Sequence, residues 1–236
     1  MKPIIAIVAT SGEDRNKAYV DTISFHGGQA CLLKPGDDFR CIKPHGVLLT
    51  GGGDLSEKFY DHSLSELEQK TLGKMEPARE QYELDLLEWG IKHPIPTLGI
   101  CRGCQMLNIF SQGTLIPDIP VWQKTTKASP FISHRAGGDS SAPAHEITIE
   151  PWSKLYQILA SQKQIAVNSS HHQALSHCGK SLVITAKAMD GIIEAIEDPE
   201  KPFWIGVQFH PERMWKRFPI FSKLFYRLLE CAREKL

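Results

Sequence analysis

The segment that most constrains the fold is PTLGICRGCQMLNIF, residues 96–110. An apolar, strand-like run leads into Cys101, and a helix-like run follows it. Gly99 and Gly103 lie two residues to either side of the cysteine. A residue at a sharp strand-to-helix turn has strained backbone angles, and neighbouring side chains would clash there unless they are absent. The G-x-C-x-G pattern therefore predicts a nucleophile elbow, with Cys101 at the N-terminus of a helix that favours the thiolate.

The same segment contains a C-x-x-C pair, Cys101 and Cys104, which is typical of redox and metal sites. A redox pair does not require both glycines, so the elbow is the favoured interpretation and Cys104 becomes a buried helix residue. A zinc site would need a second C-x-x-C or histidines at ligand spacing. The run HHQALSHC offers His171, His172 and His177, but adjacent histidines point apart on a strand.

A base and an orienting acid for the cysteine are supplied by GVQFHPE, residues 206–212. His210 ends an apolar strand-like run, and Glu212 follows two residues later, beyond Pro211. A nucleophilic cysteine needs such a base, and the base usually needs a third group to orient it. We therefore expect His210 and Glu212 to act on Cys101.

The third element is LLTGGGD, residues 48–54, in which a strand-like run ends in three glycines. Such a turn leaves backbone N–H groups unscreened, as an oxyanion hole or anion nest requires. A phosphate-binding P-loop would continue with Lys-Ser or Lys-Thr, and this turn does not.

Strand-like and helix-like runs alternate in the first half of the chain, whereas strand-like runs dominate the second half. This predicts an α/β protein, an open and mostly parallel sheet flanked by helices, with a small antiparallel addition. There is no internal repeat or clear linker, so residues 1–236 are expected to form one domain. Residues 55–75 are expected to be an irregular surface excursion and 120–144 a long loop. The expected strands are 2–9, 29–33, 45–50, 94–100, 145–150, 164–169, 181–188, 191–197 and 203–209; the expected helices are 17–26, 76–92, 102–113 and 218–235.

Composition argues against several classes of partner. The chain has 27 Lys and Arg against 27 Asp and Glu, so no basic excess indicates nucleic acid or a membrane surface. No run approaches the roughly 18 apolar residues of a membrane helix. Six cysteines without a recognisable secretory signal favour free thiols and a cytoplasmic location.

The motifs GICRGCQ, GVQFHPE and GGGD together resemble the class I glutamine amidotransferase superfamily. The segments VNSSHHQA (167–174) and DGIIEAIEDPEKPFWIGVQFHPE (190–212) are most similar to its gamma-glutamyl-gamma-aminobutyrate hydrolase group. The resemblance extends over most of residues 4–214 and implies a flavodoxin-like sheet of the class I amidotransferase type.

The resemblance also implies a role for each matching residue. Cys101 would attack the side-chain amide of a gamma-glutamyl group, His210 would shuttle the proton, and Glu212 would orient His210. The other implied residues are Gly52, Gly53 and Arg102 for the oxyanion hole, and Gln105, Ser170 and His171 for substrate binding. His172 is an almost equally good candidate for the contact assigned to His171.

The implied activity is hydrolysis of gamma-glutamyl amides of small amines such as gamma-aminobutyrate, within polyamine catabolism. The reaction would pass through a gamma-glutamyl thioester, with water as acyl acceptor, and we expect no metal and no organic cofactor. A homodimer is compatible with this activity. The alternatives are a glutaminase subunit that supplies ammonia to a separate synthase and, less favoured, a C-x-x-C redox protein.

Overall fold

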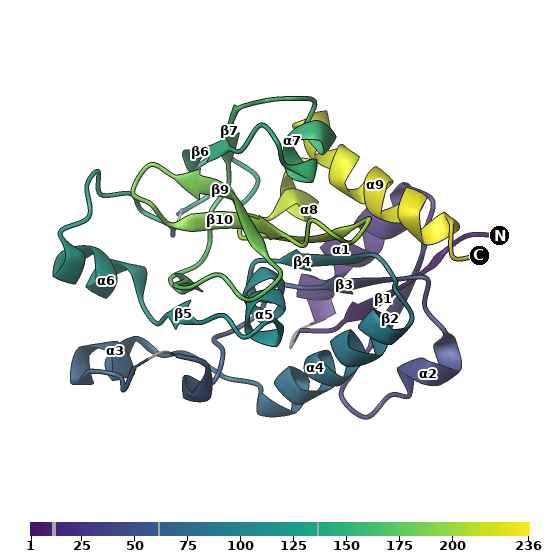
Figure 1. Ribbon diagram of the computed structural model, residues 1–236, viewed down its shortest axis with the longest axis horizontal. Coiled ribbons are helices and arrows are strands. Elements are labelled where there is room, and N and C mark those ends of the chain that lie inside the picture. Colours follow the sequence, from purple (N-terminus) through teal and green to yellow (C-terminus); the bar gives the residue numbers. More distant parts are fainter. Residues whose placement is uncertain (11–12, 61, 136) are drawn as a thin grey trace.

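The computed structural model describes residues 1–10, 13–60, 62–135 and 137–236. Eleven strands form one sheet, in which the order of the main path is β2-β1-β3-β4-β11-β10-β9-β6-β7 (Figure 1). Five neighbouring strands at one side of this order pair in parallel. They are β2 (Gln29–Leu33), β1 (Ile4–Val8), β3 (Gly46–Leu49), β4 (Thr97–Ile100) and β11 (Trp204–Val207).

The rest of the sheet is antiparallel, and all of its strands except the two-residue β5 come from the second half of the chain. Two short strands, β5 and β8, pair with each other beside β10. The α/β fold, with a parallel sheet flanked by helices and an antiparallel addition, is therefore confirmed. The addition is larger than predicted, with six strands beside the five parallel ones. The antiparallel strands are β10 (Ile193–Glu197), β9 (Val183–Ala188), β6 (His145–Ile149), β7 (Gln164–Val167), β5 (Leu115–Ile116) and β8 (Ala174–Leu175).

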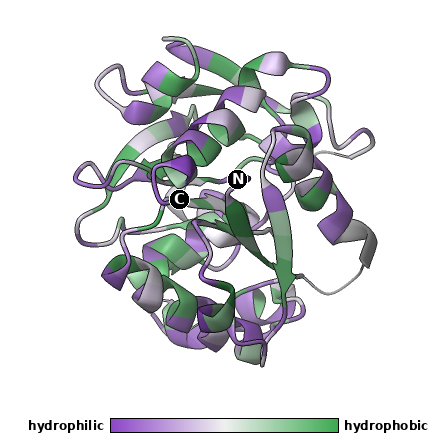
Figure 2. Cartoon of the chain, turned by 90° about the vertical axis from the view of Figure 1, so that its right-hand side faces the viewer, coloured by the Kyte–Doolittle hydropathy of each residue, from purple (hydrophilic) through white to green (hydrophobic). Residues whose placement is uncertain are grey.

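Helices cover both faces of the parallel strands because side chains alternate across each strand. Ile5 and Ile7 of β1 face the core formed with α1 and α9, whereas Ala6 and Val8 face the core formed with α4 and α5. The apolar strands accordingly run through the middle of the molecule in Figure 2. The longer helices are α1 (Glu13–Phe25), α4 (Pro77–Lys92), α5 (Arg102–Phe110) and α9 (Ser222–Arg233).

Short helices occupy several of the connections. Of these, α8 contributes Arg213 to the wall of a cavity described below. The two chain ends lie side by side, beyond the C-terminal end of α9 (Figure 1). The short helices are α2 (Phe39–Ile42), α3 (Glu66–Thr71), α6 (Ile119–Thr126), α7 (Lys154–Ile158) and α8 (Pro211–Met214), and the 3₁₀ turns are η1 (Glu57–Phe59) and η2 (Pro219–Phe221).

Two expectations about irregular segments are wrong in part, because each segment contains a short helix; the described residues of 127–144 do form a loop without helix or strand. Residues 55–75 contain α3, whose start is fixed by a capping box: the Ser65 hydroxyl accepts from the Glu68 amide, and the Glu68 carboxylate accepts from the Ser65 amide. The segment 120–144 begins inside α6, whose first turn is capped by the Asp118 carboxylate. Both helices are too short for a hydrophobic period to show in the sequence, so their capping residues are the main sequence signal for them.

Within the described residues, no helix is both long and apolar enough to cross a membrane.

Candidate active site

The nucleophile elbow predicted around Cys101 is present. β4 ends at Ile100 and α5 begins at Arg102, so Cys101 is the single residue between them. Its backbone has φ 54° and ψ −107°, a conformation that is strained for any residue with a side chain. Cys101 therefore belongs to neither regular element, and it lies at the N-terminal, positive end of α5.

The two glycines of the motif are required by close packing rather than by unusual backbone angles. A Cβ at Gly99 would lie 2.5 Å from the carbonyl oxygen of Gly103, and a Cβ at Gly103 would lie 2.3 Å from that of Leu49. Real Cβ atoms do not approach a backbone oxygen so closely. The start of α5 can therefore lie against β3 and β4 only when both positions lack a side chain.

His210 is brought to the elbow by the pairing of β11 with β4. Val207, the last residue of β11, is in register with Ile100, and the Cys101 amide donates to the Val207 carbonyl at 2.8 Å. The strand ends earlier than predicted, at Val207, and His210 instead occupies the position just before α8, without a side-chain hydrogen bond to that helix. Glu212 lies in the first turn of that helix, so its carboxylate turns back towards the imidazole.

The histidine and the glutamate form a buried pair. The Nδ1 of His210 lies 2.8 Å from Oε1 of Glu212, and both residues are almost inaccessible to solvent. Burial by itself lowers the pKa of His210, but the negative charges of Glu212 and Cys101 outweigh it and raise the pKa from 6.5 to about 9. Burial likewise raises the pKa of Glu212, yet the charge of His210 lowers it overall. The imidazolium form is therefore stabilised at neutral pH.

Asn168 holds the backbone of His210, and sequence reasoning missed it. Its side-chain oxygen accepts from the His210 amide at 2.8 Å, and its side-chain nitrogen donates to the His210 carbonyl at 3.1 Å. Asn168 belongs to the VNSSHHQA segment, which was singled out for substrate contacts only. A buried asparagine within an apolar strand-like run was the available signal, because its amide has to find partners.

The glycine turn follows β3, and Arg79 fixes its carbonyl groups. The Nη2 of Arg79 donates to the carbonyls of Thr50 and Gly51 at 3.1 and 3.2 Å, and the Gly51 amide donates to the Tyr19 hydroxyl at 3.0 Å. Within the described part of the chain, the amides of Gly52 and Gly53 make no hydrogen bond. The turn therefore has the donors that an oxyanion hole requires.

Arg102 contributes its backbone rather than its side chain to the cavity next to Cys101. The amide of the first helical residue has no partner within its helix. The guanidinium is buried at 1% exposure and pairs with Glu83, Nη1 to Oε2, at 2.5 Å. Arg79 bonds the other oxygen of Glu83 at 2.9 Å. Helix α4 thus anchors both arginines behind the glycine turn, a role that the sequence did not reveal.

Two adjoining cavities meet at the elbow, with volumes of about 490 and 300 Å³. Cys101, Gly52 and Ser170 line both of them, and His210 lines the smaller. The structure thus brings all nine predicted site residues to one region, although Glu212 lies behind His210. The larger cavity is lined by Gly52, Gly53, Asp54, Gly73, Lys74, Cys101, Arg102, Gln105, Arg135, Ser170, His171, His172 and Gln173.

The predicted substrate-binding residues differ in how available they are. Ser170 is exposed where the two cavities meet. The side-chain nitrogen of Gln105 already donates to the Gln173 carbonyl and to Oε1 of Gln208, at 3.0 and 3.1 Å. His171 lines the larger cavity, but its ring contacts the Gln173 carbonyl through Nδ1 and faces Glu194 through Nε2. Its ring nitrogens are therefore directed at the protein.

His172 points in a different direction from His171, as expected for adjacent residues in an extended segment. Its Nε2 lies 2.8 Å from Asp54 and its Nδ1 lies 3.0 Å from Asp118. Burial lowers the pKa of His172, but the two carboxylates outweigh that effect and raise it. His172 thereby links the glycine turn to the start of α6.

Cys104 is packed inside the core. It is fully buried in α5, and its Sγ would lie 2.8 Å from a Cβ placed on Gly206. Burial raises the pKa of the Cys104 thiol well above its usual value, so the reactive thiolate is disfavoured there.

A sheet of this kind, with a cysteine elbow facing a histidine, defines the class I glutamine amidotransferase-like hydrolases. The family model described as Peptidase C26 matches residues 7–212, and the chain belongs to that family. The resemblance that the sequence motifs indicated is thereby confirmed.

Individual relatives agree with this placement. A glutamine amidotransferase-like protein of Rickettsia prowazekii is 35% identical over 230 residues, which span 82% of this chain and 80% of the relative. The gamma-glutamyl-gamma-aminobutyrate hydrolase of Escherichia coli K12 is 29% identical over 142 residues, or 58% of this chain and 54% of the relative. A GMP synthase subunit of Thermoplasma acidophilum shares the fold, with a TM-score of 0.68, 13% identity and coverage of 99% and 96% of the two chains.

Proposed function

We propose that the protein hydrolyses gamma-glutamyl amides of small amines by nucleophilic catalysis at Cys101. The observation that carries this proposal is the meeting, at one cavity, of a strained cysteine elbow with the buried pair formed by His210 and Glu212. The histidine is held as a proton donor and the cysteine at a helix N-terminus, which together favour a thiolate–imidazolium pair.

In the first half of the reaction, the Cys101 thiolate attacks the side-chain amide carbon. The oxyanion that forms accepts hydrogen bonds from the amides of Arg102 and of Gly52 or Gly53. His210 then gives its Nε2 proton to the departing amine, which leaves a gamma-glutamyl thioester on Cys101. Glu212 stays ionised, accepts a hydrogen bond from Nδ1 of His210 and so keeps the imidazole oriented.

In the second half, a water molecule takes the place of the amine. Neutral His210 removes a proton from the water, which attacks the thioester carbonyl through the same oxyanion hole. Cleavage of the carbon–sulfur bond releases glutamate and regenerates the thiolate and the imidazolium. No metal or organic cofactor is required by this sequence of steps.

The larger cavity suits the polar glutamyl group. Lys74 and Arg135 place two cations on its wall, where an α-carboxylate can bind. Ser170 offers its hydroxyl to the substrate. Gln105 and His171 form part of the cavity wall, but their side-chain nitrogens face other protein groups. The backbone beside these two residues would therefore contact the substrate. We further propose that the enzyme acts in the cytoplasm and has a role in polyamine catabolism. A homodimer would be compatible with this activity.

A second candidate is a glutaminase that delivers ammonia to a separate synthase. It is favoured by the names of the amidotransferase-like relatives and by the fold shared with a protein of GMP synthase. Its chemistry at Cys101 would be the same, but the leaving group would be ammonia and the partner would be a protein.

Purified protein assayed against glutamine and a panel of gamma-glutamyl amides separates the two candidates. A stand-alone hydrolase should release glutamate from at least one gamma-glutamyl amine at a kcat/KM of about 10⁴ M⁻¹s⁻¹ or more. Turnover of glutamine alone, and only after another protein is added, would favour the glutaminase. Turnover by Cys101→Ala equal to that of the wild type would exclude both.

A further inference from the structure

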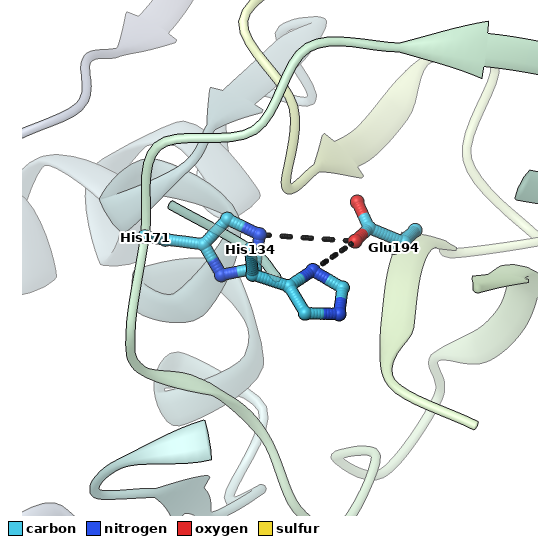
Figure 3. Close-up of side chains that lie close together, drawn as sticks. All are labelled: His134, His171 and Glu194. Atoms are coloured by element: carbon cyan, nitrogen blue, oxygen red, sulfur yellow. Dashed lines mark ion pairs between the residues drawn. The ribbon is translucent and has the colours of Figure 1, made fainter. Parts of the chain in front are cut away.

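Behind the wall of the larger cavity lies a second group of ionisable side chains, here called the histidine cluster: His134, His145, His171 and Glu194. Its members come from four segments: the α6–β6 connection, the first residue of β6, the residues after β7, and the second residue of β10. Figure 3 shows His134 and His171 converging on the carboxylate of Glu194.

Three imidazole nitrogens approach the same carboxylate oxygen. The distances to Oε1 of Glu194 are 3.2 Å from Nδ1 of His134, 3.4 Å from Nε2 of His145 and 3.7 Å from Nε2 of His171. All four side chains are at least nine-tenths buried, and none of these contacts has the geometry of a hydrogen bond. Buried polar atoms in native proteins rarely lack a partner, so five such atoms in one place call for a ligand.

The opposite nitrogen of each ring is held by an acceptor. The Nε2 of His134 lies 3.1 Å from Asp190, Nδ1 of His171 lies 2.9 Å from the Gln173 carbonyl, and Nδ1 of His145 lies 3.3 Å from the Glu146 carbonyl. A carbonyl or carboxylate oxygen can only accept, so each outer nitrogen carries the proton. In neutral imidazoles, the three inner nitrogens then present lone pairs towards Glu194.

Protons alone satisfy this arrangement poorly. Burial lowers the pKa of His134, but Asp190 and Glu194 outweigh it and raise this pKa to about 9, so His134 can carry a proton on each nitrogen. That single proton leaves the inner nitrogens of His145 and His171 without a partner. Lone pairs on the inner nitrogens would repel the carboxylate oxygen that they face. Protonating all three rings would instead pack three imidazolium ions together, and the ring centroid of His134 lies only 4.6 and 5.0 Å from those of His145 and His171. A divalent cation resolves both problems, because its charge balances Glu194 and Asp190 while the three lone pairs bind it.

We propose that the histidine cluster is a binding site for a divalent transition-metal ion, with Zn²⁺ the best fit. Three imidazoles and one carboxylate are a typical donor set for tetrahedral zinc. With metal–ligand bonds of about 2.0–2.1 Å, neighbouring donors of a tetrahedron lie about 3.4 Å apart. The nitrogen-to-Oε1 distances bracket that value. The donor atoms of His134, His171 and Glu194 all lie within 4.8 Å of one another and form the core of the site. His145, 3.4 Å from Oε1, lies outside this group of three and would complete the tetrahedron by a shift of its ring.

The surrounding residues resemble the outer shell of a zinc site. A histidine that binds zinc usually donates its other N–H to a carboxylate or carbonyl, which fixes its tautomer. Asp190, the partner of His134, is itself held by the side-chain nitrogen of Gln123 at 2.8 Å.

The site would steady the wall of the larger cavity. Ser170 and Arg135, which line that cavity, are the chain neighbours of His171 and His134, and they form a bridge between their two segments. A metal ion would bind both segments to β10 and β6. Its role is therefore to position the wall, at a distance from the cysteine chemistry, and its presence does not depend on the proposed hydrolase activity.

Zinc content of the tag-free full-length protein tests the proposal. After equilibration with Zn²⁺ and desalting, the Cys101→Ser variant, which lacks the reactive thiol, should retain about one zinc per chain by elemental analysis. Glu194→Gln and His171→Asn should lose it. His26→Asn is the matched control, because His26 is also buried with one unpartnered nitrogen but lies outside the histidine cluster; it should retain the metal.

A second measurement covers the case in which the cluster variants do not fold. Asp190→Asn keeps all four donors and should bind zinc about 10–100-fold more weakly than the wild type. Zinc in 100-fold excess over its Kd should also raise the Tm of the wild type by about 5–10 °C. Cobalt bound to the wild type should show the visible absorption bands of a four-coordinate site.

Two results would overturn the proposal. The first is zinc retained by the wild type but lost in Cys101→Ser, which would place the metal at the thiol. The second is an unchanged Tm and no retained zinc in the wild type. The histidine cluster would then be a network of protonated histidines paired with Glu194.

Discussion

The two walls of the cavity around Cys101 are built differently. The wall with Cys101, His210 and Glu212 consists of two tight turns, each of which follows a parallel strand in the same plane of the sheet. The opposite wall, around Ser170 and His171, is held by side chains from four separated segments of the antiparallel half.

The difference shows two ways of placing a functional group. At the elbow, neighbouring residues in the chain impose the geometry, so a few short motifs contain most of the information. At the histidine cluster, the geometry depends on the register of β6, β7, β9 and β10, so no local motif contains it. Substitutions should therefore act sharply and locally on the first wall, and more diffusely on the second.

The largest effect is expected at the tip of the elbow. Cys101→Ala should lower kcat/KM for the best gamma-glutamyl amide by at least about 10⁴-fold, because the covalent route is lost. The Tm should stay within a few degrees of wild type, since the change removes only one sulfur atom from a residue that lines both cavities. A comparable loss in Ser170→Ala would show that the two walls share the chemistry and would break the comparison.

Glu212→Gln should lower kcat/KM by about 10²–10⁴-fold, since the ring loses the charge that orients it. The alkaline limb of the pH profile reports the loss of the His210 proton, so it should lie near pH 9 in the wild type. Without the charge of Glu212, burial lowers the pKa of His210, and the limb should move to lower pH. An unmoved limb would show that another group titrates there.

Gly103→Ala tests the close packing below the elbow. A methyl group 2.3 Å from the Leu49 carbonyl should force α5 outwards and cost about 2–3 kcal/mol in the free energy of unfolding. Activity should fall as well, because Cys101 moves with the helix. Gly137→Ala is the matched control: nothing lies within 4 Å of its Cβ, so it should change stability by less than about 0.5 kcal/mol in chemical denaturation.

The ion pair of His210 and Glu212 should also appear in stability against pH. The folded-state pKa of His210 is raised from 6.5 to about 9, so its contribution is complete below pH 6.5 and is lost as the pH rises to 9. The stability difference between wild type and Glu212→Gln should therefore shrink across that window. Denaturant titrations at pH 6, 7.5 and 9 would measure it, and a growing difference would contradict the assigned pair.

The smallest effect is expected at Cys104. Cys104→Ala should leave kcat/KM within about threefold of the wild type and cost about 1 kcal/mol, the price of a small cavity. Limited alkylation of the native wild type should modify Cys101 before Cys104, by mass spectrometry. A disulfide between the two under mild oxidation would support the redox alternative instead.

Much of the fold and of the first wall could be predicted from the sequence. The strands show either an alternation of apolar and polar residues or a continuous apolar run, as buried strands do. Gly99 and Gly103 pointed to Cys101 because only glycine fits the close packing on either side of it. Helices α3 and α6 were missed because one or two turns are too short for a 3.6-residue period to emerge. The roles of Asn168 and Arg79 were missed because the backbone groups that they hold lie 28 or more positions away.

The sequence by itself determined the class of the fold, the position of the cysteine elbow and the spacing of His210 and Glu212, since each of these follows from residues that are neighbours in the chain. Only the tertiary structure decided that His134, His145 and His171 meet at Glu194. The physical reason is that strand pairing brings residues from four segments together, and a period of two says which face a residue occupies but not which strand lies beside it.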